Sequence, residues 1–391
     1  MTQLDTRAEA VALREQLVAW RRDFHRHPEL GLQEHRSAEI IAQELRSLGY
    51  DVETGVAETG VVGLLAGSEA GRVVMARFDM DALPIAEENE TDYVSQNEGV
   101  MHACGHDGHM AIGLGVATLL ARRRERLRGI VKLVFQPGEE GAHGALKMIE
   151  AGVLDDPRPD VALIGHVWNE QPVGTIDVAS GPVMAAADRW TCTIRGKGGH
   201  GALPHLAVDP IVAASHVVTA LQAVVSRSVS PLETAVLTVG SFQGGDAFNV
   251  IPDRVDLSGT IRTYDGKVRE RVVSRLREIA EGVAVAHEST ADLQVDHLTP
   301  AVVNDPTVAE VVRKAAEAVV GPEAVASDRC TMGSEDAAYF MQEVPGCFFF
   351  LGSANPGLGL DAAHHNPRFD FDEDVLPIGV AVMAEAILHI L

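Results

Sequence analysis

Side chains that bind metal ions are concentrated in one short stretch of the chain, MHACGHDGHM at residues 101–110. It contains one of only four cysteines, and three histidines and an aspartate stand within five positions of that cysteine. Cysteine, histidine and aspartate together are ligands of a borderline metal ion. A glycine-containing loop with solvated histidines would have the same composition, so this stretch by itself leaves both interpretations open.

Further candidate ligands follow the predicted buried strands. The strand RVVMARFD ends in Asp79, and the strand GIVKLVFQ is followed by Glu139 and Glu140. The strand DVALIG is followed by His166, and FFFLG leads into a loop with the histidine pair 364–365. In an open α/β sheet, ligands bind at the carboxyl ends of the strands. We therefore expect four segments to bring acids or histidines to one edge, where MHACGHDGH opens a helix.

The number of candidate ligands predicts two divalent metal ions. The candidates are Cys104, His106, Glu140, His166 and His365. One tetrahedral zinc needs four ligands, whereas hydrolases with two metals use more and hold a water between the ions. Asp79 and Glu139 remain to orient a histidine and to act as a general base. The thiolate favours Zn²⁺, the other ligands suit Mn²⁺ as well, and Co²⁺ and Ni²⁺ are further candidates.

The order of predicted strands and helices indicates how these side chains are positioned. Strands alternate with helices up to about residue 168 and again near the C-terminus, which indicates an α/β fold with a mostly parallel sheet covered by helices. Between 184 and 298 the order is β-α-β-β-α-β, typical of a small split-βαβ module. We expect a catalytic domain of residues 1–183 and 299–391, interrupted by this insertion. The predicted helices span 7–27, 34–48, 111–127, 144–154, 210–227, 265–284 and 307–320, with a last one from about 374.

Composition and charge narrow the class of protein. A chain of 391 residues is long enough for about two domains. The net charge of −24 argues against nucleic acid or an anionic membrane surface as a partner. The first residues do not resemble a secretory signal, and the longest apolar run, 110–121, is too short to span a bilayer. Because the four cysteines show no paired spacing, we predict a cytoplasmic protein.

Several long motifs resemble those of the aminoacylase/carboxypeptidase superfamily of dinuclear metallohydrolases. In chain order they are RRDFHRHPELGLQE, RFDMDALPI, MHACGHDGH, FQPGEEG, GKGGHGALPH, NVIPD, SGTIRT, GSEDAAYF and HNPRFDFDED. The branch that they resemble most is that of hippurate hydrolase and the plant auxin-conjugate (IAA-amino acid) hydrolases. The resemblance covers essentially the whole chain. It implies a phosphorylase/hydrolase-like catalytic domain with an inserted ferredoxin-like α+β lid.

The resemblance also implies roles in the metal site. Cys104 is similar to the ligand that bridges the two metals, and the other candidate ligands keep that role. The spacing to the following proline favours His365 over His364. Glu139 matches the general base and Asp79 a buried carboxylate that orients a neighbour, with Arg77 in the place of a ligand histidine of other branches. His102 and His109 are expected to support the ligands or to pack on the helix.

In the inserted module, the resemblance implies substrate contacts and a dimer interface. His200 and Asn249 match transition-state contacts, and Arg262 matches a residue that binds the substrate carboxylate. The implied reaction is hydrolysis of the amide bond of an N-acyl amino acid by a homodimer that forms through the lid. Whether His200 acts in its own subunit's site or the partner's stays open. The alternatives are a dipeptidase or carboxypeptidase on the same scaffold, and a metal-stabilised binding protein in which Glu139 would have no purpose.

Overall fold

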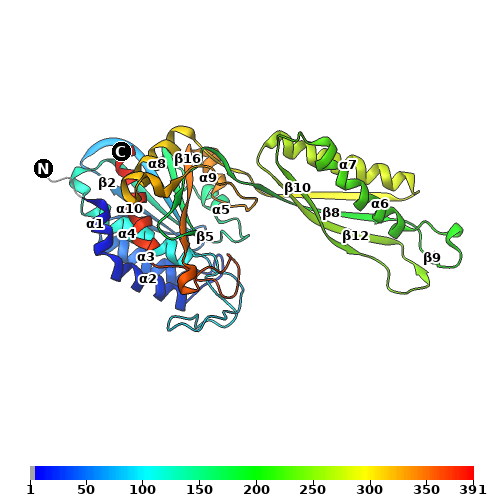
Figure 1. Cartoon of the computed structure of the whole chain (residues 1–391), viewed down its shortest axis with the longest axis horizontal. Coiled ribbons are helices and arrows are strands. Elements are labelled where there is room, and N and C mark those ends of the chain that lie inside the picture. The colour runs from blue at the N-terminus through cyan, green and yellow to red at the C-terminus, as the bar shows by residue number, and fades with distance from the viewer. Residues whose placement is uncertain (1–4) are drawn as a thin grey trace. The chain divides into compact units, whose positions relative to one another are not determined.

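The computed structural model describes residues 5–391, which form two compact units (Figure 1). The first unit comprises residues up to Val183, Val303–Cys330 and Asp336–Leu391, and the second comprises Met184–Val302 and Thr331–Glu335. The predicted insertion spans 184–298, whereas the second unit continues to Val302 and also includes the later segment Thr331–Glu335. That segment pairs with the start of the unit, where Ala185 N donates to Gly333 O over 2.8 Å.

The first unit is built around an eight-stranded sheet in the order β1-β2-β4-β3-β5-β16-β6-β15. The strands are β1 Asp51–Val56, β2 Gly60–Ala66, β3 Glu69–Asp79, β4 Arg128–Gln136, β5 Val161–Pro172, β6 Ile176–Asp177, β15 Val325–Ala326 and β16 Gly346–Ala354. The four central strands β4, β3, β5 and β16 are parallel, whereas β1, β2 and β6 add antiparallel pairs. The predicted α/β fold with a mostly parallel sheet is confirmed.

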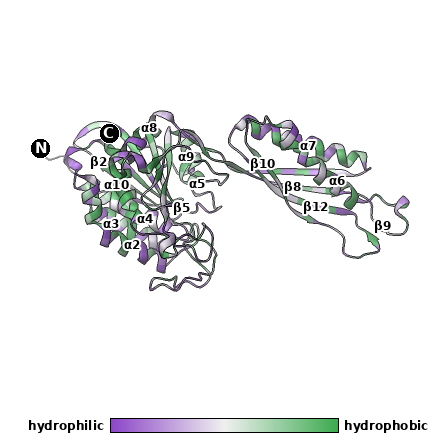
Figure 2. Cartoon of the chain, viewed as in Figure 1, coloured by the Kyte–Doolittle hydropathy of each residue, from purple (hydrophilic) through white to green (hydrophobic). Residues whose placement is uncertain are grey.

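Helices cover this sheet. They are α1 Thr6–Ala12, α2 Arg14–Arg26, α3 His35–Ser47, α4 His106–Ala121, α5 Gly144–Glu150, α8 Pro306–Val320, α9 Ala338–Glu343 and α10 Val375–Ile390. Helices α4 and α10 are largely apolar (Figure 2), and α4 is buried from His106 to Leu120, as expected of a helix in the middle of a core. The helix predicted over 7–27 is interrupted at Leu13. The reason is tertiary, because α1 packs mainly on α10 and α2 mainly on α4.

The second unit has the predicted ferredoxin-like arrangement. Along the chain it contains β8 Ala186–Arg195, α6 Pro210–Ala223, β10 Ala235–Gln243, β12 Arg254–Thr263, α7 Gly266–Ala286 and β13 Thr290–Thr299. The strands form an antiparallel sheet in the order β10-β12-β8-β13. Trp190, Val217 and Leu276 are fully buried between the sheet and the two helices. A two-stranded ribbon of β9 Gly199–His200 and β11 Val250–Ile251 extends from this unit.

Helix α6 continues to Ser228, and the combined helix Pro210–Ser228 is long and apolar enough to cross a membrane by length and composition. Within the described residues it is the one helix that meets this criterion. Ala213, Val217 and Leu221 on one side of it are buried in the core of the second unit. Helix α6 therefore packs like a helix of a globular protein. Asp209 caps the N-terminus of α6 by accepting from Ile211 N over 2.9 Å.

A buried charge network ties the N-terminal helices to the core of the first unit. Arg21 is fully buried and donates to Asp107 over 2.8 Å and to Asp370 over 2.6 Å. His25 Nδ1 lies 2.7 Å from the same Asp107 oxygen. Burial alone would raise the pKa of Asp107, but Arg21 and His25 outweigh it and hold that pKa well below its usual range. The network joins α2, α4 and the segment before α10.

Replacing Asp107 by asparagine is expected to lower the free energy of unfolding by about 3 kcal/mol, because Arg21 stays buried with less compensating charge. In the wild type this stabilisation is complete above about pH 4, the ordinary Asp pKa, and is lost as the pH falls further. Urea unfolding measures both effects. Asp374→Asn is the control, since Asp374 pairs with Arg14 at an exposed site and should change stability by under about 1 kcal/mol. Equal losses in the two variants would contradict the prediction.

Candidate metal centre

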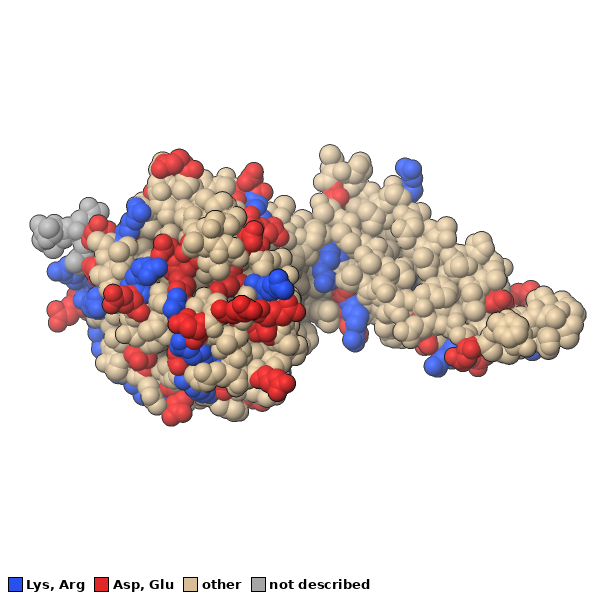
Figure 3. All heavy atoms as spheres, turned by 60° about the horizontal axis from the view of Figure 1, so that its bottom comes forward, with Lys and Arg blue, Asp and Glu red and all other residues tan. Residues whose placement is uncertain are grey.

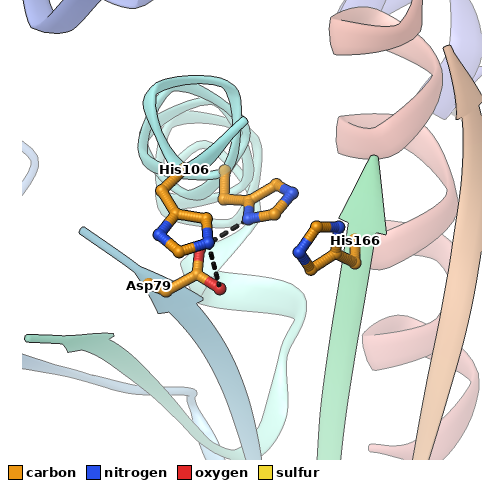
Figure 4. Close-up of side chains that lie close together, drawn as sticks. Asp79, His106 and His166 are labelled. Carbon is orange, nitrogen blue, oxygen red and sulfur yellow. Dashed lines mark hydrogen bonds and ion pairs between the residues drawn. The ribbon is translucent and has the colours of Figure 1, made fainter. Parts of the chain in front are cut away.

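Three elements of the first unit bring Asp79, His106 and His166 together (Figure 4). Asp79 ends β3, His106 begins α4 and His166 lies in β5. Gly105 allows the sharp turn into α4, because its φ of 89° lies in the left-handed region. A Cβ at Gly105 would also lie 2.3 Å from the Val167 side chain. The backbone therefore places His106 at the sheet edge in a way that only glycine permits.

His106 is held so that one ring nitrogen stays available. Its Nδ1 lies 2.8 Å from the carbonyl oxygen of Asp81, and because a carbonyl only accepts, Nδ1 donates. Nε2 is buried and has no hydrogen-bond partner among the described residues. It lies 3.6 Å from an oxygen of Asp79. A buried ring nitrogen without a partner calls for an explanation, and a metal ion supplies one.

His166 is held in the same manner. Its Nδ1 lies 2.6 Å from the carbonyl oxygen of Val167, which leaves Nε2 as the acceptor. Nε2 is 3.7 Å from the sulfur of Cys104. Burial and the neighbouring His109 hold the pKa of His166 well below its usual value, so the ring is neutral. Neutral imidazole is the form that binds metals.

His109 uses both ring nitrogens within the protein. Val167 N donates to Nε2 over 2.9 Å, so the ring proton is on Nδ1, which donates to Asp79 over 2.5 Å. Its ligand atoms lie within 4.8 Å of those of Asp79, His106 and His166, yet neither nitrogen is available to an ion. This arrangement fits the supporting role expected of His109 and gives Asp79 a neighbour to orient.

A second group of candidate ligands contains Cys104, His106 and Glu140, whose ligand atoms also lie within 4.8 Å of one another. His365 joins this group, because its Nε2 is 3.0 Å from Glu140 Oε1. His364 instead turns away, with Nε2 3.0 Å from the Val167 carbonyl and its ring packed on Trp168. The geometry therefore favours His365 over His364 as the ligand.

The carboxylates dominate the electrostatics of this group. Burial and the carboxylates of Glu140 and Glu139 raise the pKa of Cys104 well above its usual value. Burial alone would lower the pKa of His106, but Asp79 and Asp81 raise it to about 10. A divalent cation would reverse both shifts, because bound ligands lose their protons. Sulfur, nitrogen and oxygen donors are all present, so the residues fit a divalent metal.

Sequence reasoning missed Asp81, which lies two residues after Asp79 in the RFDMDALPI motif. Its carboxylate accepts from Glu139 N over 3.0 Å and from Glu140 N over 2.9 Å. The Asp81 side chain is buried, so it fixes the backbone of the turn that carries both glutamates from the interior of the unit. The motif RFDMDALPI contains this second aspartate, but nothing in its spacing indicates which backbone amides the side chain binds.

The other predicted site residues lie in the second unit. His200 pairs with Val250 across the β9–β11 ribbon, and Gly201 N donates to Asn249 O over 2.8 Å, so His200 and Asn249 are close neighbours. Arg262 lies in β12, where its guanidinium contacts Thr260 and the Ile261 carbonyl. Every candidate metal ligand belongs to the first unit. The structure thus groups the ligands, and separately His200 with Asn249.

Bound metal is expected to protect Cys104 from iodoacetamide, because a ligand thiolate is shielded by its cation. Chelation should expose the thiol, although it should react more slowly than exposed Cys330 because its pKa is raised. Mass spectrometry of labelled peptides measures both sites, and Cys330 is the internal control. Equal labelling of Cys104 with and without metal would rule out a ligand thiolate.

Comparisons with known proteins agree with this chemistry. Residues 75–389 match Peptidase family M20/M25/M40. N-acetylcysteine deacetylase of Bacillus subtilis is 39% identical over 97% of this chain and 98% of its own length. IAA-amino acid hydrolase ILR1-like 5 of Arabidopsis thaliana is 39% identical over 98% and 89% of the two chains. Thermostable carboxypeptidase 1 of Saccharolobus solfataricus is 36% identical over 96% and 94%.

A solved structure of the same kind covers both units. It is the Bacillus subtilis YXEP protein, described as a dinuclear metal binding peptidase from the M20 family. It is 34% identical to this chain, with a TM-score of 0.86 over 97% of this chain and 99% of that one. This chain therefore shares both the unit with the eight-stranded sheet and the inserted unit with that protein.

Proposed function

Because the chain belongs to peptidase family M20/M25/M40, we propose that it is an amidohydrolase that cleaves N-acyl amino acids to a carboxylic acid and a free amino acid. The observation that carries the proposal is the group of Cys104, His106 and Glu140 beside Glu139, with the Nε2 atom of His106 buried and without a hydrogen-bond partner among the described residues. A deacetylase of an N-acetyl amino acid and a hydrolase of an amino acid conjugate are both close to 40% identical to the chain.

Two divalent metals are proposed in the first unit. The residues that would hold them are Cys104, His106, Glu140, His166 and His365. When bound, such ions polarise a carbonyl and lower the pKa of a water molecule. Zn²⁺ or Mn²⁺ suits this set of sulfur, nitrogen and oxygen donors, and Co²⁺ or Ni²⁺ can substitute. Asp79 is proposed to fix His109 and, through it, the backbone beside His166.

The other roles fall to side chains that handle protons and substrate charge. Glu139 accepts a proton from the attacking water and returns it to the leaving amine. His200 and Asn249 are proposed to donate hydrogen bonds to the developing oxyanion. Arg262 is proposed to bind the amino acid's carboxylate through its planar fork, a geometry that lysine lacks.

A substrate panel tests the function and separates the alternatives. Purified protein loaded with Zn²⁺ or Mn²⁺ is given N-acetyl and N-benzoyl amino acids, an auxin conjugate and unblocked dipeptides, and free amino acid is measured. The proposal expects the acylated substrates to be cleaved with the higher kcat/KM. Faster cleavage of dipeptides would establish a peptidase on this scaffold. Absence of turnover with every substrate would favour a metal-stabilised binding protein.

Replacing His200 by alanine is expected to lower kcat by about 10²–10³-fold, the usual cost of one oxyanion donor. Metal content should stay unchanged, because His200 lies outside the ligand group. Mixing His200→Ala with Glu139→Gln subunits adds a second readout. Recovery of activity in the mixture would place His200 in its partner's site, and its absence in a mixed dimer would place it in its own. Unchanged kcat in His200→Ala would exclude the assigned role.

A homodimer through the second unit is the proposed assembly. Among the described strands, β10 lies at an edge of its sheet and pairs with β12 alone, so its outer edge is a surface suited to pairing with another strand. Val236 and Phe242 on this strand and Ile211 and Val212 on α6 are exposed apolar side chains. Light scattering on the full chain, compared with a Phe242→Asp variant, tests this surface.

The surface charge is consistent with a small-molecule substrate. Acidic side chains outnumber basic ones, 56 to 32, and Figure 3 shows many of them on the first unit. Such a surface would repel the phosphates of a nucleic acid. All four cysteines are free thiols, which supports our proposal of a reducing, cytoplasmic location.

A further inference from the structure

Three successive backbone amides of the turn that carries the two glutamates bind buried carboxylates. Gly138 N donates to Glu34 Oε1 over 2.9 Å, and the next two amides donate to the two oxygens of Asp81 over 3.0 and 2.9 Å. Both acids are buried, Glu34 at 0% and Asp81 at 1% exposure. Successive amides that point inward form an anion-binding concavity. Here the protein fills that concavity with its own side chains.

Asp81 also contacts the ligand histidine. Its carbonyl oxygen accepts from His106 Nδ1 over 2.8 Å, and its Oδ1 lies 3.3 Å from the same nitrogen. The neighbouring backbone is fixed, because Ala82 N donates to Glu29 O and Leu83 exchanges two hydrogen bonds with Met101. One residue therefore links a metal ligand to the turn that presents the general base.

Glu34 holds the start of the same turn and ends the N-terminal motif RRDFHRHPELGLQE, whose first part, with Arg21 and His25, belongs to the buried charge network. Besides Gly138 N, it accepts from Leu32 N over 3.0 Å and from the Thr59 hydroxyl over 2.5 Å. No described hydrogen bond or ion pair joins Glu34 to His106. Both acids therefore hold the turn, but only Asp81 also orients His106.

We propose that Asp81 and Glu34 are positioning residues that set the directions of the Glu139 and Glu140 side chains, and that Asp81 alone couples this turn to His106. The catalytic part of this inference rests on the proposed hydrolase function. Glu139 and Glu140 need different directions, one toward water and one toward a metal, and only a fixed backbone keeps two adjacent side chains apart in this way.

Asp81→Asn is the main test, because the carboxamide places an N–H₂ group against one of the two amide N–H groups. Asparagine keeps the backbone carbonyl that accepts from His106 Nδ1, so the effect on this ligand comes through the 3.3 Å carboxylate contact and the disturbed turn. Metal affinity and kcat should each fall by about 10–100-fold, the usual effect of altering a ligand's outer partner, with KM nearly unchanged. Glu34→Gln should also lower kcat, but its loss of metal affinity should be smaller than that of Asp81→Asn, because the direction of Glu140 is disturbed while the contact of Asp81 with His106 stays intact. Glu29→Gln is the matched control, since that carboxylate also accepts from two successive amides, Arg36 N and Ser37 N, each over 2.9 Å. It should behave as wild type.

Two readouts keep the outcomes separate. Calorimetric metal titration and the absorption spectrum of Co²⁺-loaded protein need no substrate, so they test the coupling to His106 even if no N-acyl amino acid is cleaved. Wild-type metal affinity and an unchanged Co²⁺ spectrum in Asp81→Asn would overturn the coupling. An equal loss in Glu29→Gln would overturn it too, by showing a general effect on folding. If Asp81→Asn does not fold, Glu34→Gln tests whether the buried acids position the turn. An unchanged kcat in Glu34→Gln then overturns the positioning role.

Discussion

Glu139→Gln is expected to lower kcat by about 10²–10⁴-fold, the usual contribution of a positioned general base. Glutamine keeps the size of the side chain and can still accept a hydrogen bond, but it cannot take a proton from water or return one to the leaving amine. The backbone of the turn should not change, since Glu139 N is bound by Asp81 regardless of the side chain. Steady-state assays of amino acid release give kcat, and elemental analysis gives the metal content.

Metal content is the control that makes this result specific. We expect Glu139→Gln to keep two metal ions per chain. Loss of metal in this variant, with full retention in Glu140→Gln, would mean that the two adjacent glutamates have exchanged roles. Normal turnover together with normal metal content would exclude the proposed mechanism.

Glu140→Gln is expected to lose one metal ion at low metal concentration, with activity falling in proportion. Glu140 lies within 4.8 Å of the ligand atoms of Cys104 and His106, and its Oε1 is 3.0 Å from His365. A neutral carboxamide is a weaker ligand for a hard or borderline cation than a carboxylate is. Excess metal should therefore restore part of the activity, which it cannot do for Glu139→Gln. A metal titration of kcat in both variants measures the difference.

The prediction for Glu140→Gln is contradicted if added metal has no effect on activity. In that case the carboxylate acts on substrate or protons and not on the cation. His365→Ala provides an independent check, because it removes the neighbouring candidate ligand without altering the turn. The two variants should show similar dependence on added metal.

The candidate ligands could be predicted from the sequence because their places depend on where strands end. Asp79 ends β3, and Glu139 and Glu140 follow β4, its parallel neighbour in the sheet. Strand ends can be located from short apolar runs followed by glycine and proline. The same argument expected His166 just after the strand DVALIG, whereas β5 continues to Pro172 and His166 lies within it. Local pattern and parallel order were therefore sufficient for Asp79 and the two glutamates, but not for the position of His166 along its strand.

The remaining features depend on contacts between segments that are distant in the sequence. Nothing near Asp81 indicates that its carboxylate binds amides about sixty residues later. The interruption at Leu13 follows from α1 and α2 packing on different helices. The return of residues 331–335 to the second unit has no signal in composition. Each of these needed the tertiary structure.

The order of segments along the chain has a consequence for synthesis on the ribosome. Strand β16 lies between β5 and β6, and α10 packs on α4, yet both are translated after the second unit. The second unit is nearly continuous in sequence and is expected to fold first, whereas the large sheet is completed only when β16 has been made. Until then the edge of β5 that pairs with β16 and the side of α4 that packs on α10 stay uncovered, so the first unit is expected to be the more aggregation-prone part during synthesis. The metal centre, which waits for His365, is completed among the last steps.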